Sequence, residues 1–298
     1  MKNVTRSERI FIIVSYILLG LLAVVTIVPL LSVLITSFVS ASEIARRGQF
    51  ILWPEVWDTS AYGILFKTDK LYTGYANTLF VVIVGTALSM FLTITLAYPL
   101  SKRELRGRNG ILGMVFFTML FNGGLVPTYI MYTQLFHIRD TIWALIVPNL
   151  LLSPFNVILV RNYFRTNIPD SSVEAAKLDG ASDLQTLTRV VLPISSPILG
   201  TIGLLSGLAY WNNWTNGLYY LVKRTDLYSI QNVLTNMLNN IQFLKTSAMD
   251  GINLDLSQLP SVGIRMAIAV IALIPVMIAY PLIQKSFVKG IVVGGVKG

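Results

Sequence analysis

Cysteine is absent from this sequence, and charged residues are scarce. Without cysteine the chain can form no disulfide and can offer no thiolate to a metal ion. Charged residues make up 12% of the 298 residues, whereas about 25% is typical of soluble domains. The single histidine, His137, falls in a predicted turn, where we expect it to be structural. The composition therefore argues against a soluble protein, and we expect no metal site on this chain.

Apolar residues make up 54% of the sequence and gather in six stretches that lack charged residues. Each stretch holds roughly the 20 residues that a helix needs to cross the hydrocarbon core of a bilayer. Lipid offers the backbone no hydrogen bonds, so continuous apolar runs predict helices, whereas a β-barrel would show alternation. The first run is longer than the apolar core of a signal peptide, about 7–15 residues, so we expect it to remain as a span. We predict an all-α, polytopic membrane protein, one domain with six transmembrane helices at residues 11–36, 76–100, 110–134, 141–160, 191–214 and 264–285.

The distribution of Lys and Arg predicts the orientation of these spans. Six spans place both termini on one side, together with the loop after the second span and the loop 161–190. Most of the 23 basic residues fall on that side, and short loops rich in Lys and Arg face the cytoplasm. We therefore expect a multi-pass protein of the cell membrane with cytoplasmic termini, a cytoplasmic tail at 286–298, and external loops at 40–75 and 213–263. The net charge of +9 then reflects contact with the lipid bilayer, not with nucleic acid.

The loop 161–190 carries two helix-start signals in succession. Ser171 is followed three residues later by Glu174, and Ser182 by Gln185, and both pairs have the spacing of a capping box. Gly180 lies between them and predicts a stop after the first helix. Acidic residues outnumber basic ones across both helices, so an anionic lipid surface would repel them. We therefore expect this loop to bind a protein partner instead of lying on the membrane.

Three sequence motifs resemble a known family. Glu174-Ala175-Ala176, with Gly180 four residues on and Val190-x-Leu192-Pro193 after it, resembles the cytoplasmic E-A-A signature of binding-protein-dependent ABC importer permeases, with valine in place of the usual isoleucine. The C-terminal sequence from Tyr280-Pro281 to Gly298 is similar to the tail of the maltose-type second permease subunit. The sequence Phe121–Thr128 is similar to the branch that handles complex oligo- and polysaccharides.

The resemblance implies a type I ABC importer permease fold and a coupling helix that docks into an ATP-hydrolysing subunit. It assigns this ATPase coupling to Glu174, Ala175, Ala176, Leu178, Asp179, Gly180 and Ala181. It also implies that the tail reaches between paired ATPase subunits, with contacts from Lys289, Gly290, Gly294, Gly295 and Lys297. The partners implied are a homologous second permease subunit, two ATPase subunits, an extracytoplasmic solute-binding protein and a sugar substrate.

The sequence also lacks the motifs of other classes of transporter. It contains no G-x-x-x-x-G-K-[ST] loop, so we expect this chain to bind no cofactor and the partner ATPase subunits to bind ATP and Mg²⁺. The six predicted spans contain no carboxylate, which argues against a carrier driven by protons or sodium. The alternative is a membrane-embedded enzyme that modifies glycans or lipids, but its acidic residues would have to cluster near one membrane face, and here they are scattered. We expect a sugar permease that works by alternating access and is not itself an enzyme.

A sugar path needs amide or hydroxyl groups for hydrogen bonds and flat aromatic rings for stacking. The predicted spans and their ends offer such groups at Asn122, Tyr129, Asn149, Tyr210, Asn212 and Trp214. Trp and Tyr also gather at membrane interfaces for reasons unrelated to a ligand, so this alternative stays open for the aromatic members.

Overall fold

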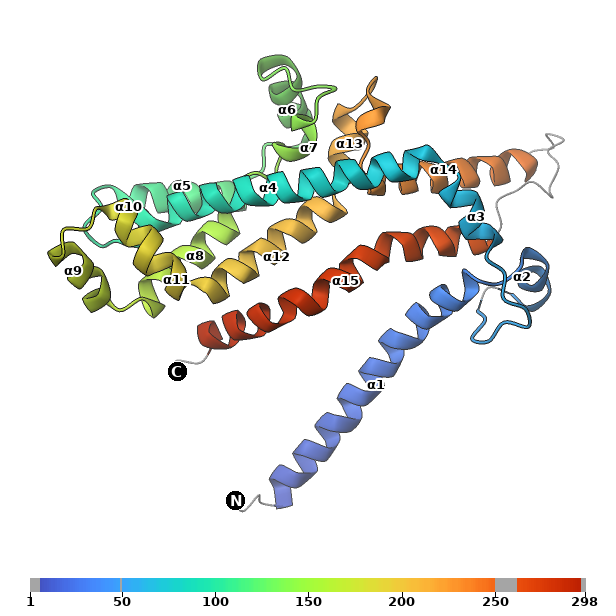
Figure 1. The fold of residues 1–298 in the computed structure, drawn as a ribbon, viewed down its shortest axis with the longest axis horizontal. Helices are drawn as coiled ribbons and strands as arrows, with labels where there is room; N and C mark the ends of the chain where they lie inside the picture. The colour runs from blue at the N-terminus through green and yellow to red at the C-terminus, as the bar shows by residue number, and fades with distance from the viewer. Residues whose placement is uncertain (1–5, 49, 250–261, 296–298) are drawn as a thin grey trace. The chain divides into compact units, whose positions relative to one another are not determined.

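The computed structural model describes residues 6–48, 50–249 and 262–295, and it divides the chain into two compact units. Unit 1 comprises Met1–Asp69 and Met237–Ile274, and unit 2 comprises Lys70–Asn236 and Pro275–Gly298. The described residues are helical except for loops and one isolated antiparallel bridge between Val39 and Trp57. The predicted all-α class is therefore confirmed (Figure 1).

Unit 1 begins with one long apolar helix and two short helices after it. These are α1 (Arg6–Thr36), α2 (Ala41–Arg47) and α3 (Ser60–Phe66). Within α1, the 29 residues Glu8–Thr36 are long and apolar enough to cross a membrane. After α1, Val39, Ile44 and Ile51 form a small buried cluster against which Val262 packs. Two further helices contribute to both units: α14 (Ile230–Met249) and α15 (Val262–Gly295).

Unit 2 is built on α4 (Asp69–Ser101), the second helix that is long and apolar enough to span a membrane. After α4 the chain forms α5 (Arg108–Leu120), α6 (Leu125–Ile130), the π-helical turn η1 (Met131–Leu135), α7 (Trp143–Ile146) and α8 (Pro154–Asn167). The chain continues through α9 (Asp170–Leu178), α10 (Asp183–Thr186), the π-helical turn η2 (Leu187–Val191), α11 (Leu192–Ile194) and α12 (Ser196–Asn212). It then forms α13 (Thr215–Tyr220) and the 3₁₀ turn η3 (Thr225–Leu227) before it enters α14.

Two apolar stretches of unit 2 are bent rather than straight. The stretch Arg108–Leu135 bends by 112° between α5 and α6, where Gly124 has a φ of 85°. The stretch Asp183–Asn212 bends by 85° before α12, at Ser195. The described residues thus hold two helices that could span a membrane, or four if each bent pair is one span, and the count of six stays a prediction.

The buried face of α4 recurs every three to four residues and is made largely of small side chains. Its members are Leu71, Gly74, Thr78, Val81, Gly85, Ser89, Thr93 and Ala97. At Gly85 the ring of Tyr210 lies where a side chain would be, because a Cβ built there would come 2.6 Å from Tyr210 Cζ. The Tyr210 hydroxyl donates a hydrogen bond to the carbonyl of Ile146 at 3.0 Å. This packing joins α4, α7 and α12 in one core.

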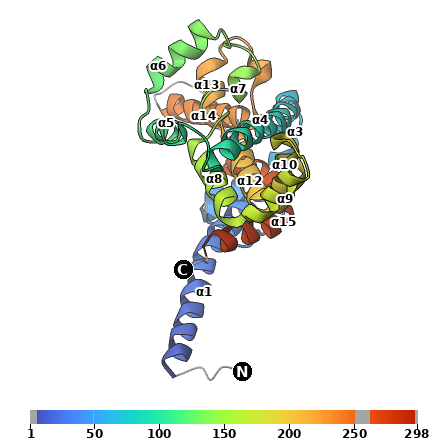
Figure 2. The ribbon, with the colours of Figure 1, turned by 90° about the vertical axis from the view of Figure 1, so that its left-hand side faces the viewer.

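A second core lies at the C-terminal end of α4 and supports the loop that precedes α12. Buried residues of α4, α8, η2 and α12 meet there, among them Tyr98, Phe164, Val191 and Ile198. Both views place α9 and α10 together at this end of unit 2, while α7 and α13 lie side by side away from it (Figures 1 and 2). The predicted coupling residues and the predicted substrate residues therefore lie in separate regions of the unit.

Candidate functional site

The first helix of the predicted protein-binding loop, α9, begins without a capping side chain. Pro169 occupies the N-cap position, and the helix begins at Asp170. The predicted capping box between Ser171 and Glu174 is therefore wrong. Ser171 lies inside the first turn and so cannot adopt the extended N-cap backbone from which a hydroxyl reaches the N3 amide. Asp170 instead places a negative charge in the first turn, where it interacts favourably with the helix dipole.

The end of α9 is a Schellman motif centred on Gly180. The amide of Ala181 donates to the carbonyl of Ala176 at 2.9 Å, and the amide of Gly180 donates to that of Lys177 at 3.0 Å. Gly180 has a φ of 80°, a conformation that is strained for other residues. The helix stop predicted at Gly180 is confirmed.

The second helix, α10, has the capping box that its sequence predicts. The Ser182 hydroxyl accepts from the amide of Gln185 at 3.3 Å, and the Gln185 side chain accepts from the amide of Ser182 at 2.8 Å. Because free backbone groups at the end of α9 and at the start of α10 are hydrogen-bonded locally, the turn between the two helices has a defined shape. The two helices thus form a bent pair, which we call the α9–α10 pair.

The α9–α10 pair is tied to the end of α4 by an ion pair that the sequence did not reveal. The Lys102 ammonium lies 2.5 Å from Asp183 Oδ1 and 4.5 Å from the centre of the Tyr98 ring. Burial works to lower the pKa of Lys102, but the hydrogen bond to Asp183 and the adjacent Tyr98 side chain leave it above its usual value. The Lys102 hydrogen bond lowers the pKa of Asp183. Since 81 positions separate the partners, no local signal could predict their contact.

The outer surface of the α9–α10 pair exposes leucines among charged groups. Leu178 is 90% exposed and Leu184 is 69% exposed. Of the residues predicted to couple to an ATPase, Glu174, Ala175, Leu178, Asp179 and Gly180 are exposed, and Ala176 and Ala181 are half-buried. The structure brings all seven predicted coupling residues into this one segment.

A cavity lies between α9 and the ends of α4 and α8. It has a volume of about 180 Å³ and is lined by α4, α8 and α9, with Lys102, Arg165, Glu174 and Lys177 among its residues. Its wall carries both positive and negative side chains.

The predicted tail residues fall at the end of α15. Lys289, Gly290, Gly294 and Gly295 belong to this helix, which continues through most of the segment expected as a tail at 286–298. Lys297 lies outside the described residues. Contact of these residues with an ATPase stays a prediction.

The predicted substrate residues occupy different surroundings. Asn122 lies in the break between α5 and α6 and accepts a hydrogen bond from the amide of Gly124 at 2.8 Å. Asn149 is exposed and has a positive φ of 61°. Asn212 is exposed, as is Trp214, at the end of α12. These four residues keep surface that could meet a ligand, and their role stays a prediction.

The two predicted tyrosines are engaged in packing. The ring of Tyr129 stacks on that of Tyr220, with centroids 5.7 Å apart, and Tyr132 meets Tyr220 edge-on at 6.1 Å. Tyr210 is only 2% exposed, and its hydroxyl is bonded to Ile146. Within this chain, Tyr210 therefore has almost no surface for a sugar and acts as a core residue.

Asp140 organises the end of unit 2 that carries these residues, although the sequence did not single it out. Its Oδ1 accepts hydrogen bonds from the backbone amides of Val222, Lys223 and Arg224 at 2.7, 2.8 and 3.2 Å. The hydrogen bond from Lys223 is the main cause that lowers the pKa of Asp140. The carboxylate therefore fixes the segment that follows α13 to the turn that precedes α7.

Apolar helices long enough to span a membrane, joined to an exposed bent helix pair, are features expected of a membrane-embedded transport permease. Residues 7–293 match the family described as binding-protein-dependent transport system inner membrane component, and the chain belongs to this family. The family predicted from the E-A-A motif is therefore confirmed, together with the type I permease fold. Its members are transport permeases, so the chain is membrane-embedded and is not an enzyme.

Relatives of similar length extend over nearly the whole chain. The polygalacturonan/rhamnogalacturonan transport system permease protein YtcP of Bacillus subtilis is 38% identical and covers 98% of this chain and 100% of its own. Protein LplC of the same organism is 36% identical over 99% of this chain and 97% of its own. A crystal structure of a bacterial ABC transporter involved in the import of the acidic polysaccharide alginate contains a chain with 32% identity and a TM-score of 0.78, covering 96% of this chain and 100% of that one.

Proposed function

We propose that this chain is one permease subunit of an ATP-driven importer that moves an oligo- or polysaccharide across the cell membrane by alternating access. The observation that carries the proposal is the α9–α10 pair, which presents exposed leucines beside a rigid glycine turn. In this mechanism two ATPase subunits, which bind ATP and Mg²⁺, hold the pair in a cleft on the cytoplasmic side. A homologous permease subunit and an extracytoplasmic solute-binding protein complete the importer.

The contacts of the α9–α10 pair support a path for the movement. The Schellman motif at Gly180 makes α9 and α10 respond together, because the turn between them has satisfied hydrogen bonds. Asp183 then passes the displacement to Lys102 at the end of α4. The core around Val191 and Ile198 passes it to α12. Closure of the ATPases would in this way act on two long helices of unit 2 at once.

We further propose that the substrate is an acidic saccharide. The YtcP relative carries polygalacturonan or rhamnogalacturonan in its name, and the solved importer takes up alginate. The six predicted spans of this chain contain no carboxylate that would repel an anionic sugar. Uptake by reconstituted importer of oligogalacturonate, compared with a neutral oligosaccharide of equal length, tests this point.

The coupling role is tested by substitutions in the α9–α10 pair. Gly180→Pro removes the amide that bonds Lys177 and forbids the positive φ, and Glu174→Lys reverses a charge on the exposed face. We expect both variants to lose transport and to co-purify with less ATPase. Gly107→Pro is the matched control, because Gly107 also has a positive φ, of 77°, with open space around it. Normal uptake by Gly180→Pro and Glu174→Lys would contradict the proposed role.

A further inference from the structure

A short segment of unit 1, residues 50–57, exposes an unusual density of large apolar side chains. Trp53 is 75% exposed and Trp57 is 58% exposed. The other exposed members are Phe50, Leu52 and Val56. Only Ile51 and Pro54 turn inward, and Ile51 packs in the small cluster of unit 1. A patch of this kind marks a surface that something apolar covers.

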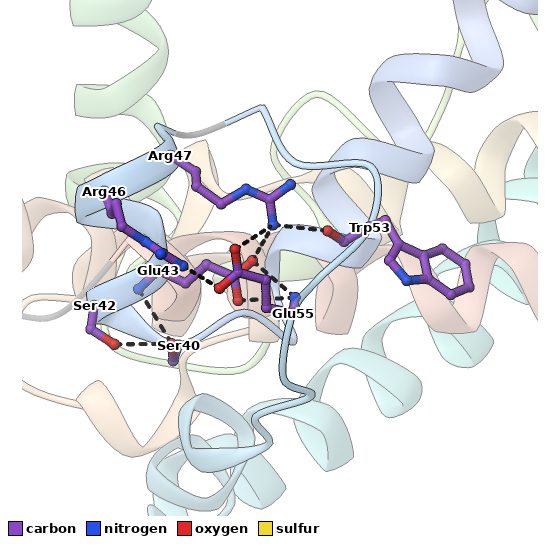
Figure 3. Close-up of polar contacts among 7 residues, drawn as sticks. All are labelled: Ser40, Ser42, Glu43, Arg46, Arg47, Trp53 and Glu55. Atoms are coloured by element: carbon purple, nitrogen blue, oxygen red, sulfur yellow. Dashed lines mark hydrogen bonds and ion pairs between the residues drawn. The ribbon is translucent and has the colours of Figure 1, made fainter.

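The 50–57 segment is held in place by a buried carboxylate. The Glu43 side chain is 5% exposed, and its oxygens accept from the amide of Glu55 at 3.0 and 3.2 Å and from Arg47 at 2.5 Å (Figure 3). Arg47 also donates to the carbonyl of Trp53 at 3.1 Å, and Arg46 pairs with Glu55. Burial works to raise the pKa of Glu43, but the hydrogen bonds from the Glu55 amide and from Arg47 leave it below its usual value. The apolar segment is therefore preorganised instead of collapsing onto the protein.

The charges of this cluster are paired with one another and lie apart from the rings. Glu43 and Glu55 both meet arginines of α2. Figure 3 shows the Trp53 indole directed away from this ion-pair cluster. The segment thus offers a partner mainly aromatic and aliphatic surface, while the carboxylates of Glu43 and Glu55 are paired with arginines. This favours an apolar medium over a protein partner that charge complementarity would steer.

The exposed rings continue directly from a membrane-spanning helix. The apolar part of α1 ends at Thr36, and the ring of Phe38 lies 5.9 Å from Trp57 and 4.9 Å from Tyr62. Trp57 in turn meets Trp53 at 6.5 Å. Four aromatic rings therefore form a connected series beginning two residues beyond α1. Trp and Tyr rings prefer the lipid–water boundary, where an apolar body and a polar edge are both accommodated.

We propose that the 50–57 segment is an interfacial anchor, which inserts Trp53 and Trp57 among the phospholipid headgroups at the C-terminal end of α1, with Glu43 as its positioning residue. The anchor fixes the position of α2 and α3 relative to the bilayer surface. The proposal does not depend on the substrate or on the coupling mechanism. It requires only the membrane embedding of the family.

The absence of cysteine makes the test direct, because single cysteines introduced into this chain are unique within it. Val56→Cys places a bimane label on the exposed segment, and Ala45→Cys places one on the exposed side of α2 as the matched control. The labelled importer is studied in vesicles of phosphatidylcholine and phosphatidylglycerol, with part of the phosphatidylcholine brominated near the headgroup end of its acyl chains. We expect brominated lipid to quench the label at position 56 and aqueous iodide to quench the label at position 45.

The role of Glu43 is tested in the same labelled background. We expect Glu43→Gln to lower the quenching of the position 56 label by brominated lipid, and Glu43→Asp, which retains the charge, to restore part of it. A merely structural role would lower the thermal midpoint without changing the depth of the label. Strong iodide quenching at position 56 would overturn the proposal. Protection of that label only after addition of the binding protein would overturn it in favour of a protein docking surface.

Discussion

The contact between Gly85 and Tyr210 allows one substitution to be worked out in detail. In Gly85→Ala the new Cβ would lie 2.6 to 2.8 Å from three atoms of the Tyr210 ring, so the ring must move. Overpacking of this kind costs about 1–3 kcal/mol. If the movement also breaks the hydrogen bond from Tyr210 to Ile146, about 1 kcal/mol is added. For a unit of this size, each kcal/mol lowers the thermal midpoint by about 2–4 °C.

Thermal unfolding of the purified protein in detergent, followed by tryptophan fluorescence, measures this cost. Tyr210→Leu opens space beside Gly85, so we expect the Gly85→Ala/Tyr210→Leu double variant to be more stable than the sum of the single effects predicts, by about 0.5–3 kcal/mol. Tyr210→Phe should lower the midpoint but leave the KM of sugar uptake unchanged, because the ring is buried. A tolerated Gly85→Ala would refute the packing interpretation. A raised KM with an unchanged midpoint in Tyr210→Phe would reassign Tyr210 to the substrate path.

Two other contacts support predictions at opposite ends of unit 2. Lys102→Asp and Asp183→Lys should each lower the uptake obtained per ATP hydrolysed, and the exchanged pair should recover part of that uptake. A double-mutant cycle of the free energy of unfolding should give an interaction energy of about 0.2–1 kcal/mol, because Asp183 is exposed. Asp140→Ala should speed hydrogen exchange of the three amides that donate hydrogen bonds to its carboxylate. Full retention of their protection would contradict the assigned role. The hydrogen bond from the amide of Lys223 lowers the pKa of Asp140 in the folded state. The stabilising effect of the ionised Asp140 carboxylate is therefore present at neutral pH and is lost as pH falls through that lowered pKa. Protection of these amides, corrected for intrinsic exchange rates, should therefore fall in acid.

Structural features that depend on residues close together in the sequence were predicted well. The helix stop at Gly180 and the Ser182–Gln185 capping box depend on residues within five positions of each other, and both are present as predicted. Ser171 shows the limit of such signals, because Pro169 two residues earlier takes the N-cap position and leaves the serine inside the helix.

Contacts between distant residues were not predictable from a single sequence. Tyr210 has the aromatic ring and hydroxyl expected of a sugar-binding residue, but its place opposite Gly85 depends on how α4 and α12 pack. Glu43 was likewise not singled out from the sequence, since its partner amide lies twelve residues away at Glu55. By contrast, the break near Gly124 in the predicted span 110–134 has a local signal, because Gly123, Gly124 and Pro127 lie there.

That break between α5 and α6 has a consequence for hydration. A chain that leaves the helix within an apolar stretch exposes peptide groups that hydrocarbon cannot solvate. Some are satisfied internally, because the amide of Phe121 bonds Phe117 and the amide of Gly124 bonds Asn122. The carbonyl of Gly124 also accepts from the amide and the hydroxyl of Thr128. The amides of Asn122 and Gly123 have no hydrogen bond within the described part of the chain, so they require water or a neighbouring subunit. In the assembled importer this point should therefore be wet or covered by protein, and it should be among the first positions in the bilayer to take up deuterium.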